Sequence, residues 1–155
     1  MDPLQKEALD YFIHNAGSPN GPIEGGIAVF ASGNEYANSA GFPGAAEMCV
    51  SVSATAADFT PATYTNYGPG TKIAAPGGDR DYYWDYWTEG DNATRGETGC
   101  VLSTLPFNVS ETGYGYMEGT SMACPHVSGV AALGLSYALE KGKKFSLDEF
   151  KTMLL

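Results

Sequence analysis

Apolar and polar positions along the chain follow helical spacing in some segments and form short, uninterrupted apolar runs in others. Near the start, Leu4, Ala8, Phe12 and Ile13 recur on one face of a helix, and Asp2 is a typical N-cap. A cluster of glycine and proline residues follows and ends this helix, because neither residue type continues one. The pattern therefore predicts an amphipathic first helix.

Four short apolar segments predict strands: residues 27–31, 48–54, 71–75 and 101–105. The first of them lacks polar alternation and is flanked by glycines, which is typical of a strand buried on both faces of a parallel sheet. The Gly- and Tyr-rich segment 114–116 is expected to be a loop.

Two further helices are predicted near the end of the chain. Residues 120–141 are apolar nearly all round, which indicates a helix buried on every side, and Gly142 is a typical residue just past a helix end. Ser146 and Glu149 form a capping-box pattern that opens the last helix. Alternating strands and helices predict an α/β, three-layer fold with a mostly parallel central sheet. Because these elements supply few covering layers, we expect residues 1–155 to be a portion of a larger domain.

Composition narrows the class of protein. The 155 residues include 8 basic and 18 acidic side chains, a net charge of −10, which disfavours a nucleic-acid partner. No apolar run approaches the roughly 20 residues that span a bilayer, so no membrane partner is expected. The three cysteines, Cys49, Cys100 and Cys124, lack the spacing of a zinc site and are interpreted as buried thiols, although one disulfide bond remains an alternative.

An acidic and aromatic segment at residues 79–99 separates two of the predicted strands and is interpreted as a surface insertion. Its aromatic side chains either cover a patch of the domain, which we favour, or bind a partner. Asp79, Asp81 and Asp85 are carboxylates that calcium accepts, but their spacing does not fit an EF-hand. The segment therefore predicts no metal site.

Two positions carry candidate chemistry. Ser121 lies at the start of the long apolar helix, where the helix dipole and free N–H groups favour a developing negative charge. Asn34 directly follows the first predicted strand, where α/β sheets bind ligands, and its amide could donate to an oxyanion. Taken singly, each has a plainer interpretation: Ser121 or Thr120 as an ordinary N-cap, and Asn34 as a turn residue.

Five motifs together resemble the C-terminal half of the catalytic domain of subtilisin-like serine proteases. They occur in the order of that family: ASGNE at 31–35, GFPG at 41–44, NYGPGTKIAAPGG at 66–78, VLSTLP at 101–106 and GTSMACPHVSGVAAL at 119–133. The resemblance covers roughly residues 20–141, and the last motif is very specific. It implies the nucleophile-bearing half of a secreted or otherwise extracytoplasmic serine endopeptidase that acts on protein or peptide substrates.

The resemblance also implies roles for individual residues. Ser121 matches the nucleophile, and Asn34 matches the side chain that forms the oxyanion hole with the backbone N–H of the nucleophile. No cofactor is implied for the chemistry, and structural calcium is common in the family, although no matching ligand set is readable in this chain.

The resemblance further implies a pocket for the substrate residue before the scissile bond. Ala31, Ser32 and Gly33 match one wall of this pocket, and Gly41 matches its floor, where a glycine leaves room for a large apolar side chain. The bond between Phe42 and Pro43 matches a peptide bond that is cis in many members of the family.

The chain departs from the family in lacking a catalytic base. Its two histidines are His14, on the first helix, and His126, which follows Ser121 by five residues and is expected to pack within the helix, facing away from it. In subtilisin itself, removal of the base lowers kcat by about 10⁶, so we expect the isolated chain to be inactive without the missing N-terminal half, which supplies the triad's Asp and His.

Two alternatives to a serine protease half remain at this point. A non-catalytic peptide-binding module on the same scaffold is disfavoured by the presence of both Ser121 and Asn34. An α/β-hydrolase requires the motif G-x-S-x-G, and Ala123 occupies its last position.

Overall fold

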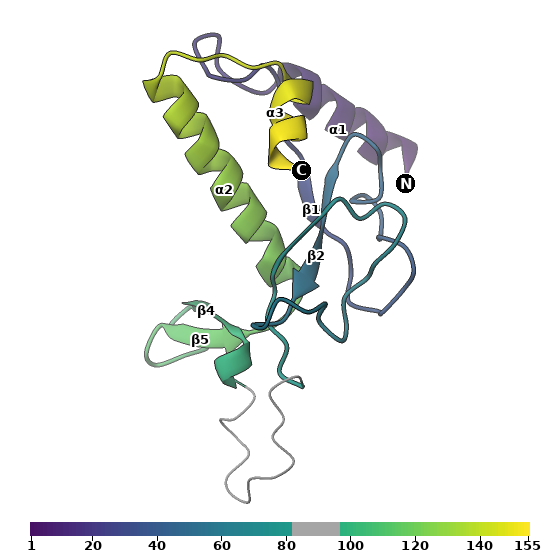
Figure 1. The fold of residues 1–155 in the computed structure, drawn as a ribbon, viewed down its shortest axis with the longest axis vertical. Coiled ribbons are helices and arrows are strands. Elements are labelled where there is room, and N and C mark those ends of the chain that lie inside the picture. The colour runs from purple at the N-terminus through teal and green to yellow at the C-terminus, as the bar shows by residue number, and fades with distance from the viewer. Residues whose placement is uncertain (82–96) are drawn as a thin grey trace, which may run out of the picture.

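The computed structural model describes residues 1–81 and 97–155 (Figure 1). Most of the expected surface insertion at 79–99 lies outside the described residues, and so does Asp85. Its described ends are Asp79 to Asp81 on one side and a short 3-10 helix, η1 (Glu97–Gly99), on the other.

A three-stranded parallel sheet lies at the centre of the fold, as the sequence predicts. Its strands are β1 (Val29–Ala31), β2 (Val50–Thr55) and β3 (Ile73–Pro76), in the order β1-β2-β3. Val29 of β1 pairs with Val50 of β2, and Val52 of β2 pairs with Ile73 of β3. The central strand is buried on both faces, since Val50, Ser51 and Val52 have no exposed surface. All three strands end at the same edge of the sheet.

The helix α2 (Thr120–Glu140) covers one face of this sheet. Ala123 and Val127 pack against Val50 and Val52 in the main core cluster. The expectation of burial on every side is wrong for the described chain, because Leu133 is 73% exposed and much of the outer face is open. By length and composition alone this helix could also cross a membrane, so the absence of a membrane partner stays a prediction. Here it packs on a sheet instead.

Helices α1 (Pro3–Asn15) and α3 (Leu147–Leu154) complete the layers. Asp2 caps α1 by accepting a hydrogen bond from the Leu4 N–H, and Ser146 and Glu149 form the predicted capping box of α3. The expectation that one apolar face of α1 packs against the core is largely wrong, because Leu4 on that face is 74% exposed. Ile13 is the buried residue of α1 and packs, with Leu9 beside it, in a cluster with Cys49 on the sheet face opposite α2.

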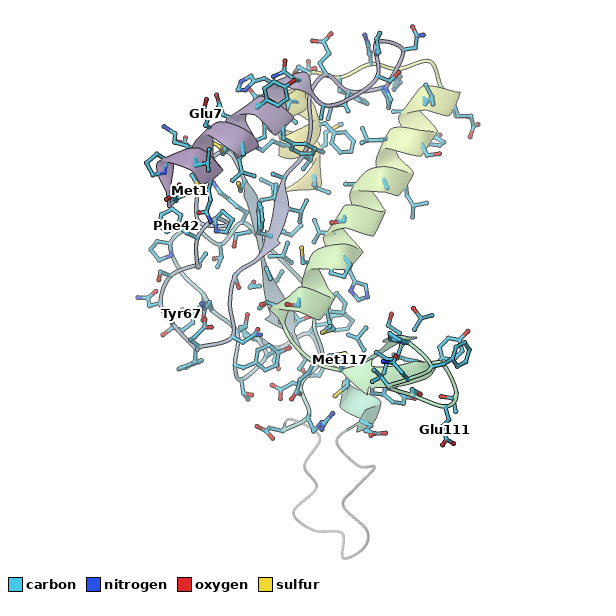
Figure 2. All side chains as sticks on the ribbon, turned by 180° about the vertical axis from the view of Figure 1, so that it is seen from behind. Met1, Glu7, Phe42, Tyr67, Glu111 and Met117 are labelled. Carbon is cyan, nitrogen blue, oxygen red and sulfur yellow. The ribbon has the colours of Figure 1, made fainter. Side chains whose placement is uncertain are left out.

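A β-hairpin stands apart from the parallel sheet and leads directly into α2 (Figure 1). It pairs β4 (Val101–Thr104) with β5 (Tyr114–Met117) in antiparallel register, with Leu102 opposite Tyr116. The prediction of a loop at 114–116 is therefore wrong. Met117 ends β5 beside the start of α2, so the hairpin lies next to the candidate nucleophile (Figure 2).

Candidate active site

The first turn of α2 presents Ser121 to solvent. Gly119 is the N-cap, with φ 146° and ψ 159°, a backbone conformation that only glycine adopts readily. The N–H groups of Met122 and Ala123 donate to the Gly119 carbonyl, while no described residue accepts from the Ser121 N–H. Ser121 thus combines an exposed hydroxyl with a backbone donor that remains open to a ligand.

The Asn34 side chain is joined to this turn across 86 positions of sequence. Its Oδ1 accepts hydrogen bonds from the Thr120 N–H at 2.9 Å and from the Thr120 hydroxyl at 2.8 Å. The Thr120 hydroxyl in turn accepts from the Gly33 N–H at 3.2 Å. Because both hydrogen bonds from Thr120 go to Oδ1, the amide has a fixed orientation in which Nδ2 is left to donate. No described residue accepts a hydrogen bond from Nδ2.

The two open donors border one space. A Cβ built on Gly119 would lie 3.5 Å from Asn34 Nδ2 and 3.7 Å from the Ser121 nitrogen. Because Gly119 has no side chain, the space beside both donor nitrogens stays open to a ligand oxygen. Such a pair of fixed donors is the arrangement that stabilises a developing oxyanion.

Gly41 lies against Ser32, and both belong to the residues that the resemblance assigns to a substrate pocket, an assignment that stays a prediction. The Gly41 N–H donates to the Ser32 carbonyl at 2.7 Å, and Gly33 has φ +111°. Ser32 is fully buried, and its hydroxyl donates to the Asn66 carbonyl at 3.3 Å. The peptide bond between Phe42 and Pro43 is cis.

Asn66 is a buried polar residue near the site to which sequence reasoning gave no role. It is 2% exposed, and its side-chain oxygen accepts from the Glu35 and Ala37 N–H groups, each at 3.0 Å. Its Nδ2 donates to the Ser32 carbonyl at 3.0 Å and to the Glu35 carboxylate at 2.8 Å. In the sequence Asn66-Tyr67-Gly68 it resembles an ordinary turn residue, so no local signal could have identified this role.

A cavity of about 280 Å³ opens beside Ser121, between α2 and β4. It is lined by Val101, Leu102, Ser103, Ser121, Met122, Pro125 and His126. The expectation that His126 packs within the helix is wrong, because its ring is exposed and borders this cavity. Its Nδ1 is 2.8 Å from the Met122 carbonyl oxygen, and no hydrogen bond joins it to Ser121 among the described residues.

His14 lies at the opposite end of the molecule, near the end of α1 (Figure 1). It is exposed, with Nδ1 at 2.8 Å from the Asp10 carbonyl oxygen and 3.6 Å from the Asp10 carboxylate. Neither histidine of the chain is therefore in place to take a proton from Ser121.

The turn before α2 is anchored to the segment of residues 77–79, which is itself held by neighbouring side chains. Asp79, 1% exposed, accepts from the Thr63 N–H at 2.6 Å and from the Asp81 N–H at 3.0 Å. The Tyr64 hydroxyl donates to the Gly78 carbonyl at 2.5 Å, and the Gly119 N–H donates to the Gly77 carbonyl at 3.0 Å. Burial, reinforced by the nearby carboxylates of Glu118 and Asp79, raises the pKa of Tyr64, so this hydroxyl stays protonated as a donor.

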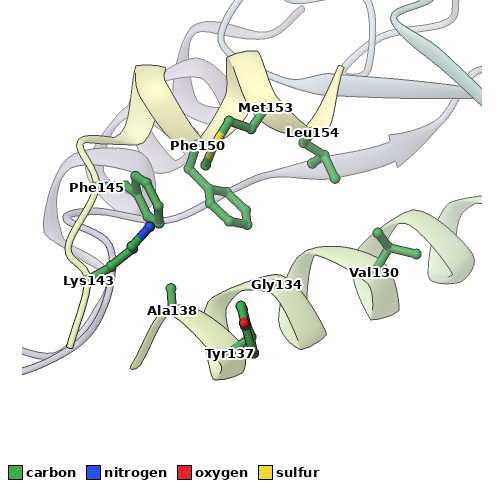
Figure 3. A pocket seen from close by; sticks show the side chains of 9 residues that line it. All are labelled: Val130, Gly134, Tyr137, Ala138, Lys143, Phe145, Phe150, Met153 and Leu154. Atoms are coloured by element: carbon green, nitrogen blue, oxygen red, sulfur yellow. The ribbon is translucent and has the colours of Figure 1, made fainter. Parts of the chain in front are cut away.

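Other parts of the described chain offer less for chemistry. Across residues 1–81 and 97–155, no three His, Cys, Asp or Glu side chains lie close enough to hold a metal ion. Burial raises the pKa of Cys49 and of Cys124, so both thiols are poor nucleophiles. A separate apolar cavity of about 310 Å³ lies between α2 and α3, where Phe150 points toward Gly134 (Figure 3).

Comparison with known proteins finds similarity to one protein family. Residues 4–155 match the model of the subtilase family. The chain is 34% identical over 137 residues to the extracellular basic protease of Dichelobacter nodosus, covering 84% of this chain and 19% of that protein. It is 31% identical over 131 residues to subtilisin BL of Lederbergia lenta, covering 84% of this chain and 38% of the relative.

Solved structures show the same relationship. The patellamide maturation protease PatA superposes with a TM-score of 0.66 at 26% identity, covering 93% of this chain and 42% of that one. The chain therefore spans between about a fifth and two fifths of the length of these relatives.

Proposed function

Because the chain belongs to the subtilase family, we propose that it supplies the nucleophile and the oxyanion-binding groups of a serine endopeptidase. One observation carries the proposal. The amide of Asn34, fixed by Thr120, and the open N–H of Ser121 border a single space beside the exposed Ser121 side chain. Protein or peptide substrates are the class on which the family acts, and the extracellular relatives support an extracytoplasmic location.

In the proposed reaction the Ser121 hydroxyl attacks the carbonyl carbon of a peptide bond. A histidine takes the hydroxyl proton, and the carbonyl oxygen becomes an oxyanion held by Asn34 Nδ2 and the Ser121 N–H. Collapse of this intermediate transfers the proton to the leaving amine and gives an acyl-enzyme, which water hydrolyses. The substrate side chain before the scissile bond enters the pocket bordered by Gly33 and Gly41.

We further propose that the base comes from polypeptide outside residues 1–155. The cavity beside Ser121 is the open approach to its hydroxyl, and its wall of Val101, Leu102 and Pro125 is mostly apolar. The same polypeptide would cover the outer face of α2, where Val130 is 61% exposed and Leu133 is 73% exposed. Removing that apolar surface from water favours the association.

Labelling with a fluorophosphonate probe, followed by intact mass measurement, tests the proposal. The probe is applied to residues 1–155 and to a polypeptide in which an upstream segment supplies the triad's Asp and His. We expect one adduct, on Ser121, in the longer polypeptide only, and none in its Ser121→Ala variant. Equal labelling of the short chain would refute the external base.

Absence of labelling in both polypeptides would refute the endopeptidase assignment. It would favour a module that binds peptides at the Gly33 and Gly41 pocket without cleaving them.

A further inference from the structure

Asn66 makes more hydrogen bonds than a turn residue requires. Its side-chain amide has two N–H donors and an oxygen with two lone pairs, and all four are used. Its backbone adds a hydrogen bond from the Asn66 N–H to the Gly33 carbonyl at 3.0 Å. Every one of these partners belongs to the loop that follows β1.

The partners of Asn66 lie on both sides of Asn34 and leave Asn34 itself untouched. Ser32 and Gly33 precede Asn34, whereas Glu35 and Ala37 follow it. A Cβ built on Gly33 would lie 2.3 Å from Asn66 Nδ2, so the loop closes directly around the buried amide. The peptide groups next to Asn34 are thus held by a residue that has no hydrogen bond to Ser121 in the described structure.

Asn66 is itself tied to the central strand. The hydroxyl of the preceding residue, Thr65, accepts a hydrogen bond from the Ala54 N–H of β2 at 2.8 Å. Asn34 is therefore restrained from two directions: from α2 through Thr120, and from β2 through Thr65 and Asn66. The Thr120 contacts set the rotation of the Asn34 amide, and Asn66 sets the backbone from which that amide projects.

We propose that Asn66 is a positioning residue for peptide-bond hydrolysis, holding the loop on both sides of Asn34 so that Nδ2 meets the developing oxyanion. This role rests on the proposed endopeptidase function. A displacement of about 1 Å in a catalytic group can cost roughly 10²-fold in rate, so loss of the buried amide is expected to act mainly on kcat.

The test compares Asn66→Ala with Thr65→Val in the intact protease. Both changes remove buried hydrogen bonds from the same turn, and only the first removes bonds to the loop around Asn34. In Asn66→Ala, amide hydrogen exchange should accelerate at Glu35 and Ala37 and remain slow at Ala54. In Thr65→Val, exchange should accelerate at Ala54 and stay unchanged at Glu35 and Ala37.

Peptide hydrolysis supplies the second readout. We expect kcat to fall about 10²-fold in Asn66→Ala, with a smaller change in KM. In Thr65→Val the hydrogen bonds between Asn66 and the loop around Asn34 remain, so kcat should fall far less, by under about tenfold. An equal loss of kcat in the two variants, or an unchanged kcat in Asn66→Ala, would overturn the role.

A charge exchange provides a version of the test that keeps the size of the side chain. In Asn66→Asp, a carboxylate replaces the Nδ2 donor and faces the Glu35 carboxylate, so kcat should fall. Adding Glu35→Gln restores a donor opposite that carboxylate, and the double variant should exceed Asn66→Asp by at least about tenfold in kcat. A double variant no better than Asn66→Asp would contradict the inferred contact.

These measurements separate the positioning role from the proposed function. A wild-type protein whose loop is protected from exchange but which hydrolyses no peptide would refute the endopeptidase function, and the positioning role with it. Hydrolysis by the wild type, with an unaltered Asn66→Ala variant, would refute only the role of Asn66.

Discussion

Replacing Gly119 by alanine places one methyl group at the point where the two open donors meet. The new Cβ would lie 3.5 Å from Asn34 Nδ2, 3.7 Å from the Ser121 nitrogen and 3.7 Å from the sulfur of Met122. Outside Gly119 and its two chain neighbours no atom lies closer, so the methyl meets no clash with the rest of the described chain. It occupies the space that the oxyanion would use, while the serine and the asparagine remain present.

Two magnitudes follow from this geometry. Gly119 has φ 146° and ψ 159°, a region that is almost restricted to glycine, so alanine there costs about 1–3 kcal/mol of stability. In subtilisin, removal of the oxyanion asparagine lowers kcat by about 10²–10³, and a methyl group that blocks both donors should cost at least as much. The change in kcat should therefore exceed anything that the modest loss of stability explains.

The assay measures kcat and KM of the intact protease on a chromogenic peptide, together with urea unfolding. Gly142→Ala is the matched control, because Gly142 has φ +62° at the other end of α2 and a Cβ there meets no atom within 4 Å. We expect comparable destabilisation in both variants and loss of kcat only in Gly119→Ala. Wild-type turnover in Gly119→Ala, or equal losses in the two variants, would refute the placement of the oxyanion beside Gly119.

Three further predictions follow from the same contacts. Thr120→Val removes one of the two hydrogen bonds to Asn34 Oδ1 and should lower kcat about tenfold, whereas Asn34→Ala should lower it by about 10²–10³ with little change in KM, as steady-state kinetics would show. Asp79→Ala leaves the Thr63 and Asp81 N–H groups without this buried carboxylate and should cost about 1–3 kcal/mol in urea unfolding, against a smaller cost for the exposed Asp58→Ala. Burial raises the pKa of the Cys49 and Cys124 thiols, so the folded state keeps protons that the unfolded state releases. The free energy of unfolding should therefore fall as the pH rises above the unfolded thiol pKa of about 8.5. Urea midpoints at pH 7 and 10 should show this decrease, and a Cys49→Ala/Cys124→Ala variant should show a smaller one.

The sequence predicted the elements whose formation depends on local pattern. The apolar run of β1, the capping box at Ser146 and the stop at Gly142 each depend on neighbouring residues, and each occurs in the structure. The hairpin strand β5 was missed because Gly115 weakens its local strand preference, and its pairing with Leu102 and Thr104 is a tertiary effect.

Burial was predicted less well than element type. Apolar residues at Leu4 on α1 and Leu133 on α2 suggested packed faces, yet both are open to solvent. An apolar residue shows that a helix position can pack against a partner. The sequence of the helix does not show whether that partner is present. Sequence pattern therefore placed these helices correctly while overestimating how much of them the described chain covers.

The candidate site was predictable only through motif resemblance. No periodicity relates Asn34 to Thr120; they meet because β1 ends at the sheet edge where α2 begins. Asn66 escaped detection because a buried asparagine with four satisfied hydrogen bonds and an exposed turn asparagine look alike in sequence.

The geometry separates two contributions to catalysis. In the proposed site, Thr120 holds Asn34 Oδ1 and Asn66 holds the loop around Asn34, both through contacts within the described chain, so the proposed oxyanion donors do not depend on the base for their position. An added segment then needs only to bring an imidazole to the cavity beside Ser121; it does not have to reorder Asn34. In subtilisin the oxyanion hole and substrate binding retain about 10³–10⁴-fold catalysis when the triad is removed. An Asn34→Ala change should therefore still lower the residual rate of an intact protease whose base has been replaced, because the two groups stabilise different parts of the same transition state.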